Sequence, residues 1–372
     1  MEIGIYVGAL AARSGTCRYV SNLISNLISI SPDDQFNLFH PADMDWGELF
    51  DVTNDNIRTT RLPFSRKVLH SIWYLGLKAF TKRRIPPVDV IHFPDPINFT
   101  LSPIKTVVTI HDIAWMKVPS AYPVKSKVVF DIMLRRILKP SNHLIAISEA
   151  TKSDLVQRLD VDEDRISVIH EGCDPKFRPV KDFATIKEKY HIRGDYILTI
   201  GVNPRKNTDR LIEAFSRLDG RILREYSLVL AGPNSYGGGK LETVADLGLE
   251  NKIIFIGTVA DNDLPGLISG AELFVYPSLY EGFGLPVLEA MACGTAVVTS
   301  NVSSMPEIAG NAAVLVNPYD IEEIADAIEQ VLSSTDLQNS LIAKGFLRAR
   351  HFSFEKMARE TLAVYKKIYT TA

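Results

Sequence analysis

Two glutamates flank a glycine turn in the segment YPSLYEGFGLPVLEAMACGTAVVTS, residues 276–300. Glu281 follows an apolar run, and Glu289 stands eight positions later, just inside the next expected helix. Because carboxylates held close together repel each other, a ligand that uses both would explain their placement. Glycines let the backbone approach such a ligand closely. The alternative is an ordinary strand-turn-helix junction with solvated glutamates.

The turn between the glutamates also suits phosphate. Pro286 favours the first turn of a helix, so residues 282–285 form the approach to it. Backbone N–H groups and the positive end of the helix dipole attract phosphate oxygens there. Glu281 could accept hydrogen bonds from sugar hydroxyls, and Glu289 could accept two from a ribose diol.

Two cations follow another strand, in TIGVNPRKNTDRLIEAF. Arg205 and Lys206 stand where a strand ends and a helix begins, and together they could meet a diphosphate leaving group. They could instead be solvated charges at a helix start, but the helix dipole disfavours cations at that end.

A histidine follows a strand in the first half of the chain. The segment VTIHDIAW places His111 and Asp112 at the carboxyl end of the apolar run. A lone histidine is commonly a structural hydrogen-bonding residue, and this alternative stands beside a catalytic role. We expect Asp112 to orient the imidazole ring.

The elements that position these residues are short apolar strands alternating with helices. Continuous hydrophobicity indicates strands buried on both faces, as in parallel sheets covered by helices. Repeated βα units predict an α/β protein with doubly wound domains, which bind ligands at the carboxyl ends of their strands. The expected strands are IGIYV, QFNLF, DVIHF, TVVTI, HLIAIS and ISVIH, then YILTIG, SLVLAG, KIIFIG, ELFVYPS, AVVTS and AAVLV.

The chain of 372 residues is too long for one ordinary core and predicts two domains. Proline and charge interrupt the pattern in HEGCDPKFRPVKD, residues 170–182. We therefore expect a first Rossmann-like domain over 1–178 and a second over 179–352, facing each other across a cleft. An amphipathic helix over 353–372 is expected to pack back on the first domain.

Composition excludes several classes of protein. The net charge of −3 excludes a globally basic nucleic-acid-binding protein. Three scattered cysteines argue against a disulfide framework or a zinc site. No apolar run reaches the roughly 18 residues that a spanning helix needs, and the segment MEIGIYVGAL predicts a strand rather than an export signal. We expect a cytoplasmic protein.

The segment PSLYEGFGLPVLEAMACGTAVVTSNVSSMPEI resembles glycosyltransferase family 4, with the Glu-x7-Glu signature of retaining glycosyltransferases of the GT-B fold. The resemblance covers essentially the whole chain. It implies that Glu281 contacts the transferred sugar, that Glu289 holds the ribose, and that Arg205 and Lys206 meet the donor diphosphate. Many relatives have Gly-Arg before this lysine, whereas Val202 follows Gly201 here.

The same resemblance implies further donor contacts. It gives His111, with Asp112 beside it, a place next to the donor sugar. The first loop, ARSGTCRYV, has Ser14 where many relatives have a second glycine, and the segment GTVADNDLPGLI is expected beside the nucleotide base. The remaining implied donor-binding residues are Gly15, Arg18, Gly257, Thr258, Val259, Gly282, Phe283, Gly284 and Leu285.

Two other motifs point away from a cofactor. Asp160-Val161-Asp162 matches the Asp-x-Asp of metal-dependent glycosyltransferases, but it lies in an acidic turn before a strand. Gly237-Gly238-Gly239-Lys240 lacks the spacing of a nucleotide-hydrolysing P-loop and is interpreted as a turn. We expect neither a metal ion nor another cofactor.

The resemblance implies transfer of a hexose from a nucleotide sugar to a hydroxyl of a glycan or lipid-linked glycan, with retention. The segments PRKNTDRLIEAF and HDIAW resemble bacterial mannosyltransferases of O-antigen and other surface polysaccharides, which favours GDP-mannose. A UDP-hexose donor is the alternative. A non-catalytic nucleotide-sugar-binding protein, a phosphorylase and a sugar-nucleotide epimerase are the other candidates with this fold.

One segment of the first domain is strongly basic. Eight lysines and arginines and no acidic residue lie in the range 58–84. The simplest interpretation is a solvated helix face, with Leu69, Trp73 and Leu77 in the core. Since basic residues attract anionic lipid, we also expect peripheral contact with the inner membrane surface through this segment.

Overall fold

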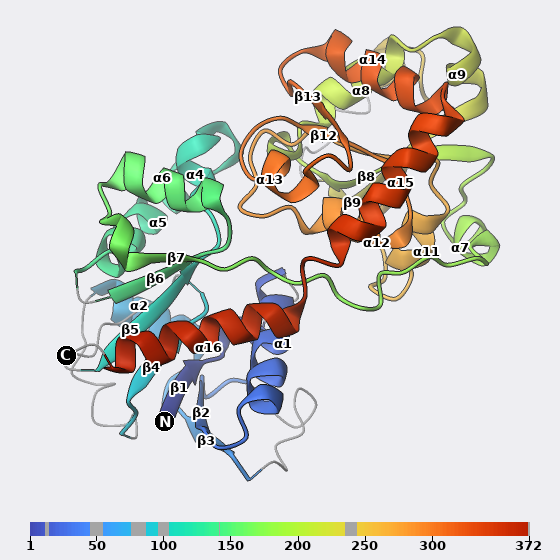
Figure 1. Cartoon of the computed structure of the whole chain (residues 1–372). Helices are drawn as coiled ribbons and strands as arrows, with labels where there is room; N and C mark the ends of the chain where they lie inside the picture. The colour runs from blue at the N-terminus through green and yellow to red at the C-terminus, as the bar shows by residue number, and fades with distance from the viewer. Residues whose placement is uncertain are drawn as a thin grey trace. The chain divides into compact units, whose positions relative to one another are not determined.

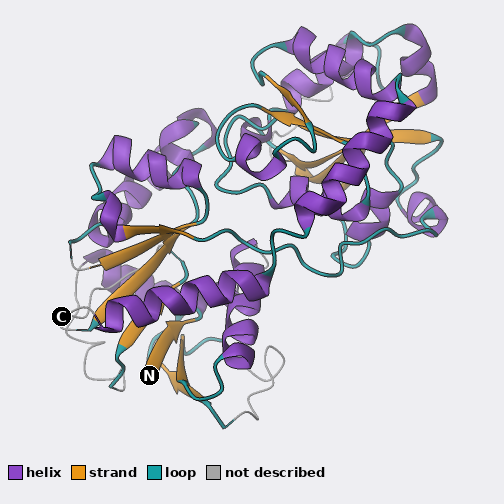
Figure 2. Ribbon diagram, in the orientation of Figure 1, coloured by secondary structure: helices purple, strands orange, loops and turns teal. Residues whose placement is uncertain are grey.

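The computed structural model describes residues 1–11, 15–44, 55–75, 87–95, 104–140, 142–234 and 244–370. The chain forms two compact units (Figure 1). The first contains Met1–Ile113, Pro123–Gly172 and Ser353–Ala372, and the second contains Ala114–Tyr122 and Cys173–Phe352. Gly237–Lys240 lies outside the described residues, as does part of the basic segment. Each unit is an α/β structure built on a parallel sheet, as the apolar runs predicted (Figure 2).

The sheet of the first unit has the strand order β3-β2-β1-β4-β5-β6-β7. All its pairs are parallel, so every strand ends at the same edge. The strands are β1 (Glu2–Tyr6), β2 (Gln35–His40), β3 (Ile57–Arg61), β4 (Val90–Phe93), β5 (Lys105–Ile110), β6 (Asn142–Ala146) and β7 (Ile166–Val168).

Two long helices, α1 and α16, pack side by side against this sheet (Figure 1). The buried residues of α16 recur every three or four positions, as in Phe354, Met357, Ala358 and Thr361, so one stripe enters the core. The helices of the first unit are α1 (Gly15–Ile30), α2 (Arg66–Leu75), α5 (Val124–Ile137), α6 (Glu149–Leu159) and α16 (Phe354–Thr370), with short 3₁₀ turns η1 (Gly8–Ala11) and η3 (Glu163–Arg165).

The sheet of the second unit has the order β10-β9-β8-β11-β12-β13, again with parallel pairs. Ligand-binding residues are therefore expected just after β8 and β11, which are neighbours at its centre. The strands are β8 (Asp195–Val202), β9 (Tyr226–Asn234), β10 (Ile253–Gly257), β11 (Leu273–Tyr276), β12 (Val297–Ser300) and β13 (Val314–Val316).

The core of the second unit joins apolar residues of its strands with those of α8 (Thr208–Ser216), α9 (Gly220–Glu225), α14 (Ile321–Leu332) and α15 (Thr335–Ala349). The other described helices of this unit are α4 (Ala114–Lys117), α7 (Ala184–Lys189), α11 (Leu264–Ser269), α12 (Leu285–Cys293) and α13 (Met305–Ala309), with 3₁₀ turns η2 (Pro119–Ala121) and η4 (Pro204–Lys206).

The strand β3 had no counterpart among the expected strands. Its sequence, IRTTR, contains one aliphatic residue and is largely exposed or half-buried. It pairs only with β2 at the edge of the sheet, so it carries no continuous apolar run. No helix among the described residues is long and apolar enough to cross a membrane.

Candidate functional site

The carboxylate of Glu281 binds both predicted cations in the second unit. Lys206 Nζ donates to Oε1 at 2.6 Å, and Arg205 Nη1 donates to Oε2 at 2.7 Å. The hydroxyls of Ser278, at 2.6 Å, and Tyr276, at 3.1 Å, also lie within hydrogen-bond distance of Oε1. Three residues that the sequence separates by up to 76 positions therefore form one charged cluster.

Glu281 stays ionised because of these neighbours. Its side chain is 8% exposed, and those of Arg205 and Lys206 are 21% and 12% exposed. Burial alone would raise the pKa of the carboxyl, but Lys206 and Arg205 outweigh it and lower that pKa to about 2. At neutral pH this cluster has two positive charges and one negative charge. The remaining positive charge favours an anionic ligand.

A local bulge and a cap place the two cations. The pairing of β8 with β9 shifts register between Ile200 and Val202, and Gly201 has φ +94°. A Cβ at this glycine would lie 3.0 Å from Cγ of Lys206, so a side chain there would press on the lysine. Asn203 then caps η4 by accepting a hydrogen bond from Lys206 N at 3.1 Å.

Hydrogen bonds to main-chain atoms join the turn at Arg205 to the turn at Glu281. Leu279 N donates to Arg205 O at 2.9 Å, and Arg205 Nη1 donates to Tyr280 O at 3.0 Å. Ser303, with φ +57°, accepts from Glu281 N at 2.8 Å through its hydroxyl. Because one main-chain bond and two bonds between side chain and main chain fix these turns, the charged side chains are held before any ligand arrives.

The glycine turn reaches α12 in a conformation that requires glycine. Gly284 has φ +120°, and a Cβ there would lie 2.4 Å from Cε of Met305. Phe283 is 3% exposed, and its ring packs edge-on against Phe352 with centroids 5.7 Å apart. Phe283 can therefore face a ligand only through its backbone. Gly282 is buried and Leu285 is half-buried at the first position of α12.

Glu289 lies on α12 and is 5% exposed. It is close enough to Tyr276 to contribute to the raised pKa of that phenol, whose main cause is burial. A second carboxylate thus stands near the charged cluster, as the spacing of the two glutamates suggested.

Gly257, Thr258 and Val259 lie apart from this cluster. Gly257 is the last residue of β10, and Thr258 and Val259 follow it. Strand β9 separates β10 from β8 in the sheet. Gly257 has φ +67° with open space where a Cβ would stand, and both it and Thr258 are exposed. This position at the carboxyl edge leaves their backbone accessible to a ligand.

In the first unit, His111 follows β5 and is held by a residue that the sequence analysis did not select. Its Nδ1 lies 3.2 Å from Oε1 of Glu171, and Nε2 donates to Pro94 O at 2.8 Å. The edge of the ring faces the ring of Tyr19, with centroids 4.9 Å apart. The expectation that Asp112 orients His111 is wrong, because Glu171 and Pro94 occupy both ring nitrogens.

This geometry favours the imidazolium form of His111. A carboxylate and a carbonyl only accept hydrogen bonds, so both ring nitrogens must carry hydrogen to satisfy them. Burial lowers the pKa of the ring, but the hydrogen bond and charge of Glu171, the Pro94 carbonyl and the charge of Asp95 outweigh it and raise that pKa. Burial in turn raises the pKa of Asp95.

A buried chain of polar groups runs behind His111. The OH of Tyr365, on α16, lies 2.5 Å from Nδ1 of His92, and Nε2 of His92 lies 2.9 Å from Thr109 Oγ1. Thr109 Oγ1 is 3.1 Å from the OH of Tyr19, whose ring contacts His111. Burial lowers the pKa of His92 to about 3, so this ring is neutral, and its two hydrogen-bond partners hold it in place.

Comparison with known proteins identifies the family. The family described as "Glycosyl transferases group 1" matches residues 182–348, and "Glycosyltransferase Family 4" matches residues 17–177. O-antigen chain mannosyltransferase B of Escherichia coli is 33% identical over 267 residues, 70% of each protein. The chain belongs to glycosyltransferase family 4.

Two further comparisons agree with this family assignment. Serotype-specific mannosyltransferase WbdA of Escherichia coli is 32% identical over 235 residues, which is 60% of this chain and only 29% of that longer protein. The crystal structure of WaaG, a glycosyltransferase involved in lipopolysaccharide biosynthesis, superposes with a TM-score of 0.73 at 17% identity, covering 98% of this chain and 99% of that one. At that identity the match shows the fold alone, which is GT-B.

Two residues of this glycosyltransferase were expected at its first loop. Gly15 begins α1 and is exposed, with open space where a Cβ would stand. Arg18 follows on the same helix and is half-buried. Ser14 lies outside the described residues.

The two aspartates of the Asp-x-Asp motif have structural roles in this glycosyltransferase. Asp160 ends α6 in a left-handed conformation, and Asp162 caps η3 by accepting from Asp164 N at 3.0 Å. Within the described part of the chain, no group of three or more histidines, cysteines and acidic residues is placed to hold a metal ion.

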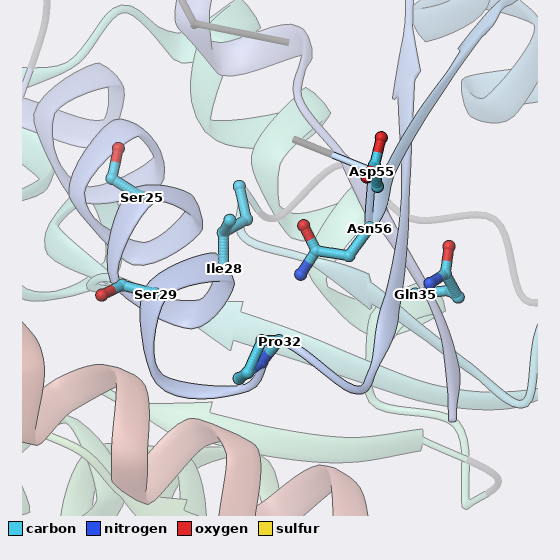
Figure 3. A pocket seen from close by; sticks show the side chains of 7 residues that line it. All are labelled: Ser25, Ile28, Ser29, Pro32, Gln35, Asp55 and Asn56. Atoms are coloured by element: carbon cyan, nitrogen blue, oxygen red, sulfur yellow. The ribbon is translucent and has the colours of Figure 1, made fainter. Parts of the chain in front are cut away.

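A hollow of about 480 Å³ lies elsewhere in the first unit (Figure 3). It is at the amino ends of β2 and β3, whereas His111 follows the carboxyl end of β5. The described side chains around it include one carboxylate and no cation, so it does not resemble the cluster of Arg205, Lys206 and Glu281. They are Ser25, Ile28, Ser29, Pro32, Gln35, Asp55 and Asn56.

The sequence analysis missed the groups that hold the charged residues. Glu171, Tyr276, Ser278 and Ser303 all contact a predicted site residue. Glu171 follows β7 at the same sheet edge as His111, so the rule that ligands collect at the carboxyl ends of parallel strands could have found it. Its segment was instead used only as a domain boundary.

Proposed function

We propose that this family 4 glycosyltransferase moves a hexose from a nucleotide diphosphate sugar to a hydroxyl of a glycan or lipid-linked glycan, with retention at the anomeric carbon. The observation that carries the proposal is the buried cluster of Arg205, Lys206 and Glu281, which has an excess of positive charge. An anionic leaving group beside it gains most from that charge as it departs.

The proposed donor contacts follow from where each group lies. The two cations and the backbone of Gly282, Phe283 and Gly284 bind the diphosphate. Glu281, already hydrogen-bonded to both cations, accepts from hydroxyls of the transferred sugar. Glu289 accepts from the ribose, and Leu285 begins the helix that faces the phosphate.

Further contacts complete the proposal. The backbone of Gly257, Thr258 and Val259 lies along the nucleotide base, and Gly15 and Arg18 bind near the diphosphate. His111 and Asp112 contact the transferred sugar. Because Nε2 of His111 donates to Pro94 O, a sugar hydroxyl would replace that carbonyl while Glu171 keeps its hold on Nδ1.

The chemical step requires the diphosphate to leave from a sugar that becomes oxocarbenium-like. The bond between C1 and the phosphate oxygen breaks, and its electron pair stays on that oxygen. The acceptor oxygen bonds to C1 on the same face, and its proton passes to the departing phosphate. Arg205 and Lys206 neutralise the charge that develops, so we propose that no metal ion or other cofactor is needed.

GDP-mannose is the proposed donor, and surface polysaccharide synthesis is the proposed setting. The support is the likeness to two mannosyltransferases of Escherichia coli, an O-antigen chain mannosyltransferase over 70% of this chain and a serotype-specific one over 60%. A UDP-hexose is the second candidate, since the charged cluster itself binds diphosphate rather than a base.

Peripheral contact with the inner membrane surface through residues 58–84 of this otherwise cytoplasmic enzyme is also proposed. Within the described part, Arg58 and Arg61 lie on β3, and Arg66 and Lys67 begin α2. Leu69 is buried, as a helix packed on the sheet requires, whereas the side chain of Trp73 and the residue Leu77 lie outside the described residues.

A donor panel tests the proposal. Purified enzyme is incubated with GDP-mannose and with several UDP-hexoses, with and without glycan acceptors, and nucleotide release is measured. The proposal predicts acceptor-dependent release of GDP and an axial product linkage by NMR. Binding without turnover across the whole panel would instead support a nucleotide-sugar-binding protein, and isomerised sugar without acceptor would support an epimerase.

A further inference from the structure

The short helix α13 of the second unit packs against the glycine turn, residues 282–284. Ser304, just before the helix, donates through its Oγ to Phe283 O at 2.5 Å. Met305, the first residue of α13, fills the space beside Gly284, where a Cβ would lie 2.4 Å from the Cε of this methionine. The position of α13 therefore determines where the backbone of the glycine turn lies.

The five residues of α13 cannot hold this helix in place by themselves. An isolated helix shorter than about 12 residues is marginal in water, and the last carbonyls of a helix have no partner within it. Arg348, on α15, supplies partners at the end of α13. Its Nε donates to Ile308 O at 2.9 Å, and its Nη2 donates to Glu307 O. The guanidinium thus holds the end of α13 opposite to the one that contacts the glycine turn.

The same guanidinium reaches the glycine turn by a second route. Cζ of Arg348 lies 4.9 Å from the centroid of the Phe352 ring. That ring packs edge-on against the ring of Phe283, with the centroids 5.7 Å apart. Both aromatic side chains are buried, at 6% and 3% exposed. Since Phe283 is the central residue of the turn, a shift of Phe352 would move the backbone on either side of it.

We propose that Arg348 is a positioning residue for donor binding, because it holds α13 and Phe352, and through them the glycine turn. This inference rests on the proposed function, in which the backbone of residues 282–284 binds the diphosphate. The described contacts of Arg348 are to main-chain carbonyls and an aromatic ring, so it acts through its neighbours rather than on the substrate.

Nucleotide affinity separates positioning from general stability. Protection against thermal unfolding by GDP, GMP, UDP and UMP gives the affinities of the wild type and of Arg348→Gln. Arg348→Gln should bind the diphosphate preferred by the wild type about tenfold more weakly, as after the loss of a hydrogen bond to a charged group. Affinity for the corresponding monophosphate should stay nearly unchanged. Turnover at saturating donor should also fall about tenfold or more, because a displaced turn stabilises the leaving diphosphate less well.

Two further variants divide the contacts of Arg348. Arg348→Lys keeps a cation whose ammonium can donate to the two carbonyls, so it should recover part of the lost diphosphate affinity. Phe352→Leu leaves the carbonyl contacts in place and removes the ring between Arg348 and Phe283. It should reduce the diphosphate preference by less than Arg348→Gln does, and it tests the ring route even if Arg348→Gln does not fold.

Arg165 in the first unit offers a matched control. This half-buried arginine also donates to main-chain carbonyls, with Nε 3.2 Å from Asn142 O and Nη2 3.3 Å from Leu138 O. Arg165→Gln should therefore lower the melting temperature, as Arg348→Gln does. Because Arg165 lies in the other unit, its loss should leave the preference for diphosphate over monophosphate as in the wild type.

The outcomes separate this inference from its premise. If the wild type prefers a diphosphate and Arg348→Gln keeps that preference, Arg348 is only a helix cap and the inference is wrong. The inference is equally wrong if Arg165→Gln loses the preference to the same extent as Arg348→Gln. A wild type that no diphosphate protects more than its monophosphate would overturn the proposed diphosphate site, and the role of Arg348 with it.

Discussion

Glu281 in the second unit is buried, whereas His111 in the first is half-buried. Both are ionisable side chains beyond the carboxyl ends of parallel strands. Glu281 binds two cations, and His111 binds a carboxylate and a carbonyl. Glu281 lies between two cations that lower its pKa to about 2, so its charge does not change over the physiological range. His111 lies between a carboxylate and a carbonyl that raise its pKa from a value already near neutrality.

The two sites therefore differ in how their charge depends on pH. Arg205 keeps its charge near neutral pH, and Lys206 is paired with the ionised carboxylate of Glu281, so the second unit offers constant stabilisation to an anion. The charge of His111 depends on pH and on Glu171, so the first unit can respond to proton concentration. An enzyme that combines them should bind its nucleotide equally well over a broad range of pH while turnover changes.

The largest expected effect comes from removing one side of the Glu281 cluster. Lys206→Ala and Glu281→Ala should each lower turnover by about 10²-fold or more, because each removes a contact to the charge that develops in the reaction. Steady-state kinetics measures this, with circular dichroism to establish that the fold is intact. The matched control is Arg221→Ala, whose exposed ion pair with Asp219 lies elsewhere in the same unit. Turnover like the wild type in either cluster variant would remove the cluster from the donor site.

Glu289→Ala should act on nucleotide binding more than on the chemical step. Losing a hydrogen bond from a charged group costs about 1.5–3 kcal/mol, which is roughly tenfold to a hundredfold in affinity. Titration calorimetry with GDP measures the affinity, and kcat at saturating donor measures the chemistry. If the affinity stayed constant and kcat fell instead, the roles of the two glutamates would be reversed.

A smaller effect is expected from Glu171→Gln. The amide carries no charge, so the pKa of His111 should fall toward the value that burial alone favours, and the alkaline limb of the pH–rate profile should move to lower pH. The raised pKa also stabilises the folded protein below the pKa of unfolded histidine, and this stabilisation is lost as pH rises through the folded pKa. The variant should therefore lose stability chiefly at acidic pH. Thermal unfolding and kcat across pH 5–9 would measure both, and unchanged profiles would mean that Glu171 has no influence on His111.

Chelation should have the smallest effect. Activity in excess EDTA should equal activity without it, because the proposed diphosphate contacts are Arg205, Lys206 and a helix start. The control is addition of manganese or magnesium to the chelated enzyme. Loss of activity in EDTA with rescue by either ion would show that the cations of the second unit are insufficient.

Sequence reasoning found what depends on local chemistry. The parallel sheets followed from continuous apolar runs, and the turn at Glu281 and the pair Arg205–Lys206 each lie directly after such a run. What it missed depends on neighbours distant in the chain. Glu171 reaches His111 across 60 positions because β6 and β7 bring its segment to the same sheet edge.

The most direct test of the cluster of Arg205, Lys206 and Glu281 is protection against thermal unfolding by nucleotides in EDTA. It is measured for the wild type, for Arg205→Gln with Lys206→Gln, and for the control Arg221→Gln. GDP, GMP, UDP and UMP are compared at pH 6 and pH 8. We predict that one diphosphate protects wild type and control much more than its monophosphate, by up to about 2.7 kcal/mol at a hundredfold excess over Kd, equally at both pH values, and that the double variant loses this preference. A double variant that the same diphosphate protects as strongly as the wild type would contradict the assignment of Arg205 and Lys206 as the diphosphate site.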